Sequence, residues 1–253
     1  MKIFVLSISM LVAMLTQSIA AQTFNDETVH YKVMYKWGLI NKQAGTASLS
    51  IKTVGENYNT QLIAKSEPWA DKFYTVRDTL NGQIQKDGFL PLFYEKIAHE
   101  GGDFKHDIVN YSRNADTVIG YCTRIKRKGD KAKGTKKEHV ISATGRTVDM
   151  LSVYYYMRSL DYPNMKNDEE LTLNIFSGKS KEILTIKFHG IETITCDQES
   201  HPCYHISFTF TSDGEKKTSE DMDAWISTDT RRIPLKLEGT LPVGKVQCFY
   251  TGG

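Results

Sequence analysis

The stretch TASLSIKTVGENYNTQLIA, residues 46–64, decides the fold of this chain. In its first half, Ala47, Leu49 and Ile51 alternate with polar residues, which is the period of a β-strand with one buried face. Gly55-Glu56-Asn57 then supplies turn residues, and a second alternating segment begins at Tyr58. A strand, a short turn and a second strand form an antiparallel hairpin. We therefore expect the sheet to be built from consecutive hairpins.

The same alternation recurs along most of the chain. Turn residues interrupt it at 87–88, 101–102 and 114–116. Strands connected so closely pair mainly with their sequence neighbours, which predicts an antiparallel meander. The expected strands cover residues 29–35, 46–54, 58–64, 73–84, 90–98, 104–111, 117–125, 171–176, 183–188, 191–196, 204–210, 223–227, 234–237 and 245–250.

One segment has the period of a helix instead. Between Thr147 and Leu160 the apolar residues stand at 150, 153, 154, 157 and 160, and Asp161 to Pro163 ends the pattern. The fold class expected is mainly β: a large antiparallel meander forming a curved sheet or open barrel, with one principal helix at about 147–160. Because no low-complexity linker separates the two β-rich halves, residues 22–253 are expected to form a single domain.

The first 21 residues have the features of a secretory signal peptide. Lys2 precedes the apolar segment 3–15, which is shorter than the ~20 residues that a membrane-spanning helix needs. Ser18-Ile19-Ala20 follows with the small residues of a cleavage site. We therefore expect residues 1–21 to be removed on export, leaving a protein that does not span the membrane.

Composition narrows the function classes further. With 40% hydrophobic residues, six prolines and a formal net charge of +2, the chain is typical of a folded globular protein and gives no sign of nucleic-acid binding. Ser177-Gly178-Lys179-Ser180 resembles the end of a phosphate-binding loop. However, Leu173 stands where that motif needs glycine, and a strand is expected to follow, so we interpret these residues as a β-turn. No motif predicts a cofactor, a metal or catalytic residues, and we lean against an enzyme without excluding one.

The four cysteines favour disulfides in an oxidising compartment. Cys196 and Cys203 flank a turn-like segment, so a local disulfide between them is expected. Unpaired thiols are one alternative. A metal site with His201 and His205 is another, which is disfavoured because the sequence lacks a second close pair of ligands. Whether Cys122 and Cys248 pair with each other is left open.

Aromatic residues cluster at 67–74 and in the tyrosine triplet 154–156. Exposed aromatic rings can line a ligand cleft, whereas packed ones fill the core of a sheet. In the adjacent strand, either the charge of Arg77 or that of Asp78 points inward, where it needs a partner. The candidate ligand-binding residues are therefore Trp69, Tyr74, Arg77 and Tyr155, with a buried ion pair or a polar pocket near Arg77.

Residues 124–137 form a strongly basic segment with glycines at 129 and 134. Its candidate anion contacts are Lys126, Arg127 and Lys128, which would bind a phosphorylated lipid headgroup or an acidic glycan. The alternative is a solvated hairpin whose charges discourage edge-to-edge aggregation.

Several stretches together resemble the DUF3108 family of exported bacterial proteins of unknown function. They are residues 31–37, 44–47, 73–78, 149–161, 224–238 and 241–246. The resemblance covers nearly the whole chain after residue 21. It implies a periplasmic or surface location in a Gram-negative, Bacteroidetes-like bacterium. It implies little about activity and supplies no catalytic residues.

Three functions compete at this point. Exported curved sheets resemble the half-barrels that carry lipids or lipoprotein acyl chains, so the leading hypothesis is a non-enzymatic periplasmic binding or carrier protein for an apolar or amphiphilic ligand. The second is an envelope scaffold that docks a partner protein through a sheet edge or the basic hairpin. The third is a hydrolase of an envelope polymer, which would need convergent polar groups in a cleft.

Overall fold

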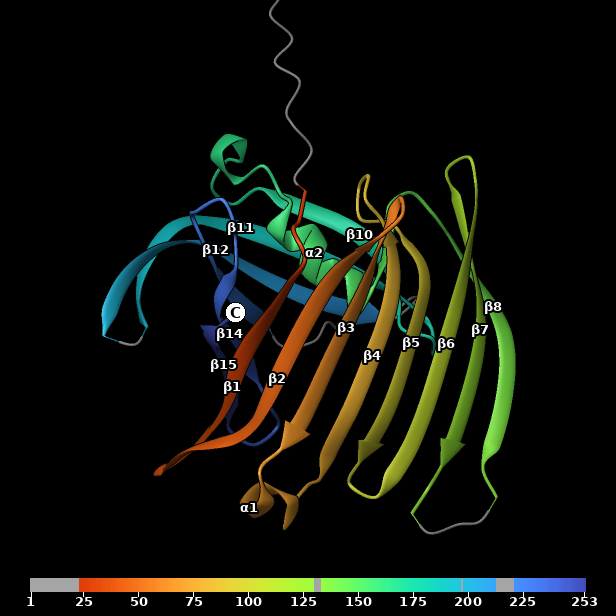
Figure 1. The fold of residues 1–253 in the computed structure, drawn as a ribbon, viewed down its shortest axis with the longest axis horizontal. Helices are drawn as coiled ribbons and strands as arrows, with labels where there is room; N and C mark the ends of the chain where they lie inside the picture. The colour runs from red at the N-terminus through yellow and green to blue at the C-terminus, as the bar shows by residue number, and fades with distance from the viewer. Residues whose placement is uncertain (1–22, 130–132, 197, 213–220) are drawn as a thin grey trace, which may run out of the picture.

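The computed structural model describes residues 23–129, 133–196, 198–212 and 221–253, so the expected signal peptide lies outside the described residues. Within them, fifteen strands form one curved sheet that closes nearly into a barrel, with a short helix on its inner side (Figure 1). The predicted fold class is confirmed.

The elements follow in chain order. The first half contains β1 (Glu27–Trp37), β2 (Ile40–Val54), β3 (Asn57–Ser66), α1 (Pro68–Asp71), β4 (Val76–Gln85), β5 (Pro91–Glu100), β6 (Asp103–Asn114), β7 (Thr117–Arg127) and β8 (Thr135–Thr144). The second half contains β9 (Thr147–Asp149), α2 (Ser152–Arg158), the 3-10 helix η1 (Tyr162–Asn164), β10 (Glu170–Phe176), β11 (Lys181–Cys196), β12 (Glu199–Ser212), β13 (Met222–Ser227), β14 (Pro234–Thr240) and β15 (Lys245–Gly252).

The spatial order of the strands is β8-β7-β6-β5-β4-β3-β2-β1-β15-β14-β13-β12-β11-β10-β9. Sequence neighbours pair antiparallel, as the short turns predict, and the short β9 pairs parallel with β10. The first and last strands meet in the middle, where Lys32 of β1 lies opposite Phe249 of β15. This β1–β15 seam joins the two halves of the chain into one sheet.

The predicted helix is present but shorter than expected. Residues 147–149 form β9, and α2 begins only at Ser152. The carboxylate of Asp149 explains the change, because its Oδ1 accepts the backbone N–H groups of Leu151 and Ser152 at 2.8 and 2.7 Å. This side chain takes the place of the missing helical partners and fixes the start of the helix.

Two strands differ from the prediction. β11 is continuous where two strands were expected, because a register shift between Phe188 and Gly190 lets the strand bend without ending. β8 was not predicted, since most of its residues are polar and exposed. It forms one end of the sheet, where a strand need not bury a hydrophobic face.

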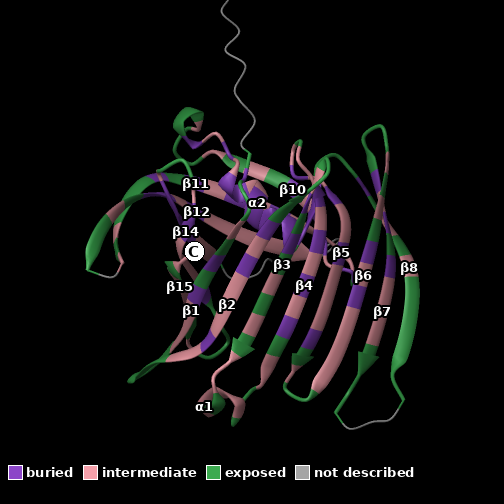
Figure 2. Ribbon diagram, viewed as in Figure 1, coloured by how far each residue is buried: buried purple, intermediate pink, exposed green. Residues whose placement is uncertain are grey.

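Alternation places apolar residues on the inner face of the sheet, as the banding along the strands in Figure 2 shows. Leu49, Leu62 and Leu80 lie opposite one another across β2, β3 and β4. The helix α2 sits between two core clusters: Tyr154 and its neighbours pack on the β1–β8 side, and Met157 packs on the β10–β13 side. The interior next to α2 is therefore filled by side chains.

The largest side chain fully buried in this interior is that of Arg158 at the end of α2. Its Nη1 lies 2.6 Å from Glu27 Oε1. Its Nε and Nη2 donate to the backbone carbonyls of Arg232 and Arg231 at 3.1 and 2.8 Å, and the guanidinium lies 4.4 Å from the ring centroid of Phe24. One side chain thus joins the helix to β1 and to the β13–β14 connection.

The expected disulfide between Cys196 and Cys203 is wrong. Cys196 lies opposite Glu199 and Cys203 opposite Glu192, so the cysteines stand four residues apart along the β11–β12 ladder. That is about 13 Å at the rise of a strand, against a limit of ~7 Å between the Cα atoms of a disulfide. No disulfide joins any of the four cysteines, all of which are described. Burial raises the pKa of the Cys203 thiol to about 12.

The buried cap of α2 predicts a pH effect on stability. Burial raises the pKa of Asp149 from 3.8 to about 6, although N–H groups at the helix start oppose the shift. Since the folded pKa is the higher one, the folded protein takes up a proton between about pH 6 and pH 4, and the free energy of unfolding rises as pH falls through that window.

Asp149→Asn keeps an acceptor oxygen for the cap but cannot titrate. We expect the stability of the variant relative to wild type, measured by urea unfolding, to fall by about 2 kcal/mol between pH 7 and pH 4.5. A relative stability that is equal at the two pH values would contradict the burial of this carboxylate.

Candidate anion-binding cleft

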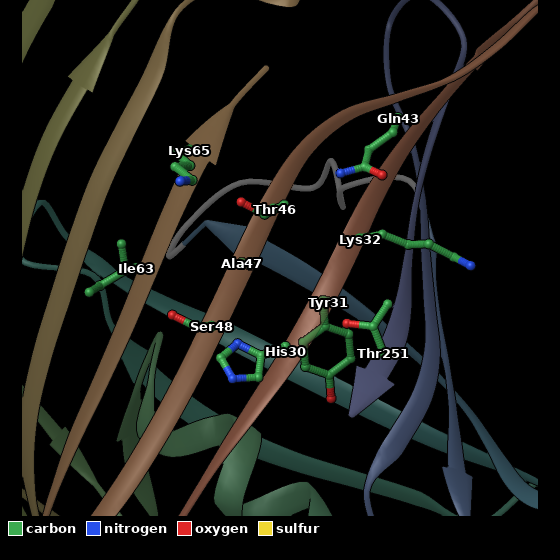
Figure 3. Close-up of a pocket in the computed structure, with 10 residues that line it drawn as sticks. All are labelled: His30, Tyr31, Lys32, Gln43, Thr46, Ala47, Ser48, Ile63, Lys65 and Thr251. Atoms are coloured by element: carbon green, nitrogen blue, oxygen red, sulfur yellow. The ribbon is translucent and has the colours of Figure 1, made fainter. Parts of the chain in front are cut away.

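A cleft of about 520 Å³ lies on the outer face of β1, β2 and β3, beside the end of β15 (Figure 3). The residues that line it are His30, Tyr31, Lys32, Gln43, Thr46, Ala47, Ser48, Ile63, Lys65 and Thr251. It lies on the opposite side of the sheet from the filled interior around α2.

Strand register brings the polar residues together. His30 lies opposite Ser48, and Ser48 lies opposite Ile63, so the three side chains share the outer face. Lys32, Thr46 and Lys65 form a second outer row by the same rule.

Irregular pairing of β1 accompanies the hollow. The register of β1 shifts against β15 between His30 and Tyr31, and against β2 between Val33 and Met34. Such bulges bend a strand and re-aim its side chains. The cleft is thus located where the β1–β15 seam departs from a regular ladder.

The lining of this cleft is cationic. Among the described residues it contains Lys32, Lys65 and His30 but no aspartate or glutamate. Ile63 adds an apolar surface that is 44% exposed. Two ammonium groups beside an exposed aliphatic side chain suit a ligand with an anionic end and an apolar body.

The predicted ligand residues separate in the structure. Trp69 adjoins the cleft, because its Nε1 donates to the carbonyl of the lining residue Gln43 at 2.6 Å. Arg77 lies opposite Lys65 on the next strand, where its guanidinium pairs with Asp71 at 2.6 Å and is exposed. Tyr74 is exposed and packs on the β5–β6 turn at Gly101.

Tyr155 lies apart from the other three. It is buried in the core, where its hydroxyl donates to the Ser50 carbonyl at 3.0 Å and its ring contacts Phe24. The structure does not bring Tyr155 together with Trp69, Tyr74 or Arg77 in one cleft, because α2, which carries it, lies on the inner side of the sheet.

The predicted anion contacts also separate. Lys126 lies opposite Lys105 and shares the inner face of the sheet. Arg127 points to the other face, with its guanidinium 5.3 Å from the ring centroid of Phe104, and Lys128 follows the strand as an exposed residue. Residues 130–132 of the same basic segment lie outside the described residues.

The inward charge predicted beside Arg77 belongs to its neighbour. Asp78 is buried on the inner face of β4, and the Nζ of Lys96 lies 3.5 Å from its Oδ2. The same Nζ lies 3.0 Å from Glu100 Oε1, and Lys105 binds the other oxygen of Glu100 at 2.6 Å. A chain of ion pairs therefore crosses the inner face, as expected of charges that are removed from water.

The pKa values of the carboxyl groups in these inner ion pairs follow from their contacts. Burial raises the pKa of Asp78, although Lys96 opposes the shift. Burial also disfavours ionised Glu100, but the hydrogen bonds from Lys105 and Lys96 outweigh it and hold the pKa of this carboxyl at about 2. Farther along the sheet, the Nε of Arg124 lies 3.2 Å from buried Asp107, whose pKa is raised by burial.

The inner ion pairs and the outer cleft differ in their ligand chemistry. In the inner ion pairs, carboxylates face the ammonium groups. Among the described residues that line the outer cleft, none is an aspartate or a glutamate, and the Nζ of Lys32 lies 5.7 Å from the ring centroid of Phe249. A second outer cleft of about 630 Å³ lies over β2–β5 and is lined mainly by amide and hydroxyl side chains, among them Asn59, Gln61 and Asn81. We therefore take the β1–β3 cleft as the candidate site.

Sequence reasoning missed His30, Lys32 and Lys65. They are the polar members of alternating strands, which the sequence presents as ordinary solvent-facing residues. Their placement on one face depends on the β1–β2 and β2–β3 registers, and the Nζ of Lys32 lies over the Phe249 ring of β15. The available signal was the absence of acids at outward positions between 29 and 54.

Comparison with known proteins agrees with the fold. The model of the family described as "Protein of unknown function (DUF3108)" matches residues 28–249. The chain belongs to the DUF3108 family. No curated protein matches it. The family resemblance read from the sequence is thereby confirmed.

The structure is similar to a solved β-barrel-like protein of the DUF1849 domain of unknown function from Brucella abortus. The TM-score is 0.64 at 8% identity, over 92% of this chain and 98% of that chain. This DUF3108 protein therefore shares the fold of that structure. It also matches a protein with a YmcC-like fold from Bacteroides fragilis, provisionally named as exported, with a TM-score of 0.34 at 9% identity over 91% and 99% of the chains. Among its described residues, no helix is long and apolar enough to cross a membrane.

We expect the loss of a charge to lower the free energy of unfolding less on the outer face of β4 than on its inner face. Arg77→Met removes an exposed ion pair and should lower the free energy of unfolding by less than about 1 kcal/mol. Lys96→Met leaves Asp78 buried without its cation and should cost about 2–3 kcal/mol. Urea unfolding at pH 7 measures both variants, and an equal loss in the two would contradict the inward placement of Asp78.

Proposed function

We propose that this DUF3108 protein is an exported, non-enzymatic binding or carrier protein for an anionic amphiphile, which it holds in the outer cleft of β1–β3. The observation that carries the proposal is the composition of the described lining, which has the basic side chains Lys32, Lys65 and His30, no acidic residue, and the exposed Ile63. The basic side chains favour a negative headgroup, and the aliphatic surface accepts part of an acyl chain.

The location of the ligand differs from that of a half-barrel carrier. Such a carrier encloses its ligand, whereas here Phe24, Tyr154, Tyr155 and Phe176 fill the interior on the β1–β8 side of α2. An outer cleft leaves the ligand partly in contact with water. That suits an amphiphile that is exchanged at a surface, in the periplasm or on the cell surface where we place the protein.

The test compares two detergents that share one acyl chain. Dodecyl phosphate has an anionic headgroup and dodecyl maltoside a neutral one. We expect calorimetry below the critical micelle concentrations to give a dissociation constant for the phosphate that is lower by at least about tenfold, since each screened charge pair contributes on the order of 1 kcal/mol.

The variants locate this binding. Lys32→Gln combined with Lys65→Gln should remove the preference for dodecyl phosphate. Lys52→Gln, an exposed lysine farther along β2, is the matched control and should retain it. Equal affinity for both detergents in the wild-type protein would refute an anionic ligand, and a preference that survives the double variant would place the site elsewhere.

A further inference from the structure

The β1–β15 seam brings the tips of two hairpins side by side. Tyr35 donates its hydroxyl proton to the carbonyl of Val243 at 3.0 Å, and Lys36 lies opposite Lys245. Gly244 makes this approach possible: its φ is +80°, and a Cβ there would lie 2.5 Å from the Lys36 carbonyl oxygen. The β1–β2 and β14–β15 connections therefore form one surface.

A third connection extends this surface. The segment that contains α1 lies against β2, since Trp69 binds the Gln43 carbonyl and the Nζ of Lys42 lies 4.8 Å from the Trp69 ring centroid. Phe73 contacts Trp69 at 6.3 Å between centroids. In Figure 1 the β1–β2 tip, the β14–β15 connection and α1 lie along the same lower edge of the sheet.

Large apolar side chains are exposed along this edge. We call the set Trp37, Leu39, Ile40, Phe73, Leu241 and Val243 the apolar rim. Trp37 is 55% exposed, Phe73 is 82% exposed, and Leu39 is fully exposed at the hairpin tip. Scattered apolar residues on a surface need no explanation, but a contiguous group at one end marks an interaction surface.

The charges around the apolar rim are mainly positive. The connections 36–42 and 241–245 contain Lys36, Lys42 and Lys245 and no acidic residue, although Lys245 pairs with Glu238 of β14 at 3.0 Å. In the third connection Lys72 is exposed, Asp71 is held by Arg77, and Glu67 accepts a hydrogen bond from Gln43. Tryptophan and aliphatic tips flanked by lysine are the combination that enters the interface of an anionic bilayer.

We propose that the apolar rim docks this protein on an anionic membrane surface, with Trp37, Leu39 and the neighbouring tips inserted among the lipid headgroups. The rim residues do not line the β1–β3 cleft. Docking therefore goes beyond the proposed ligand binding, and either can fail without the other. An apolar face of a partner protein would bury the side chains of the apolar rim, but it would not explain the lysines around them.

Flotation with lipid vesicles tests the proposal. The protein without residues 1–21 should float with vesicles of equal parts phosphatidylglycerol and phosphatidylethanolamine, and much less with phosphatidylcholine alone. Added salt should weaken the binding, because it screens the lysines. Trp37→Ser combined with Leu39→Ser should lower the partition coefficient by at least about tenfold, since it removes two exposed apolar side chains at the β1–β2 tip.

The control exchanges two exposed apolar residues away from the rim. Tyr121→Ser combined with Val140→Ser changes the outer faces of β7 and β8 and should bind vesicles as wild type does. Circular dichroism establishes that both double variants are folded. The proposal is overturned if wild-type protein does not float with anionic vesicles, which would leave the rim to a protein partner, or if the rim and control variants bind equally well.

Discussion

The buried guanidinium of Arg158 is the interaction on which the rest of this structure depends. It pairs with Glu27 at the start of β1 and donates to two backbone carbonyls of the β13–β14 connection. A guanidinium buried without partners costs several kcal/mol. Burial of the Arg158 side chain is therefore favourable only when all of these partners are in place. Helix α2, the first strand and the C-terminal hairpins are therefore coupled in one folding unit, which fixes the β1–β15 seam.

The seam determines where both proposed surfaces lie. On the outer face, the irregular pairing of β1 with its neighbours accompanies the cleft that contains Lys32 and Lys65. At the end of the sheet, the same pairing places Lys36 opposite Lys245 and brings two hairpin tips together. The cleft and the apolar rim are thus two consequences of one junction, which joins strands from opposite ends of the chain.

The local sequence pattern was sufficient to predict the hairpins of the sheet, but not the pairing of β1 with β15 at the seam. The hairpin 46–64 was predictable because alternation and a turn specify β2 and β3 from adjacent residues. The pairing of β1 with β15 depends on packing around α2, which no local period encodes. The expected Cys196–Cys203 disulfide was wrong for a related reason, since Cys196 already lies opposite Glu199 in the ladder and Cys203 therefore lies farther along β12. In the pair Arg77–Asp78, the sequence showed that one charge would face inward, and only the register of β4 decided that it is Asp78.

The central claim is that the β1–β3 cleft binds the anionic end of an amphiphile. The most direct measurement is a crystal structure of the protein with dodecyl phosphate at saturating concentration. The account predicts a phosphate group within hydrogen-bond distance of the Nζ atoms of Lys32 and Lys65, with the alkyl chain along Ile63. A phosphate bound instead by the inner cations near Arg124, or a cleft that contains only water at saturation, would contradict it.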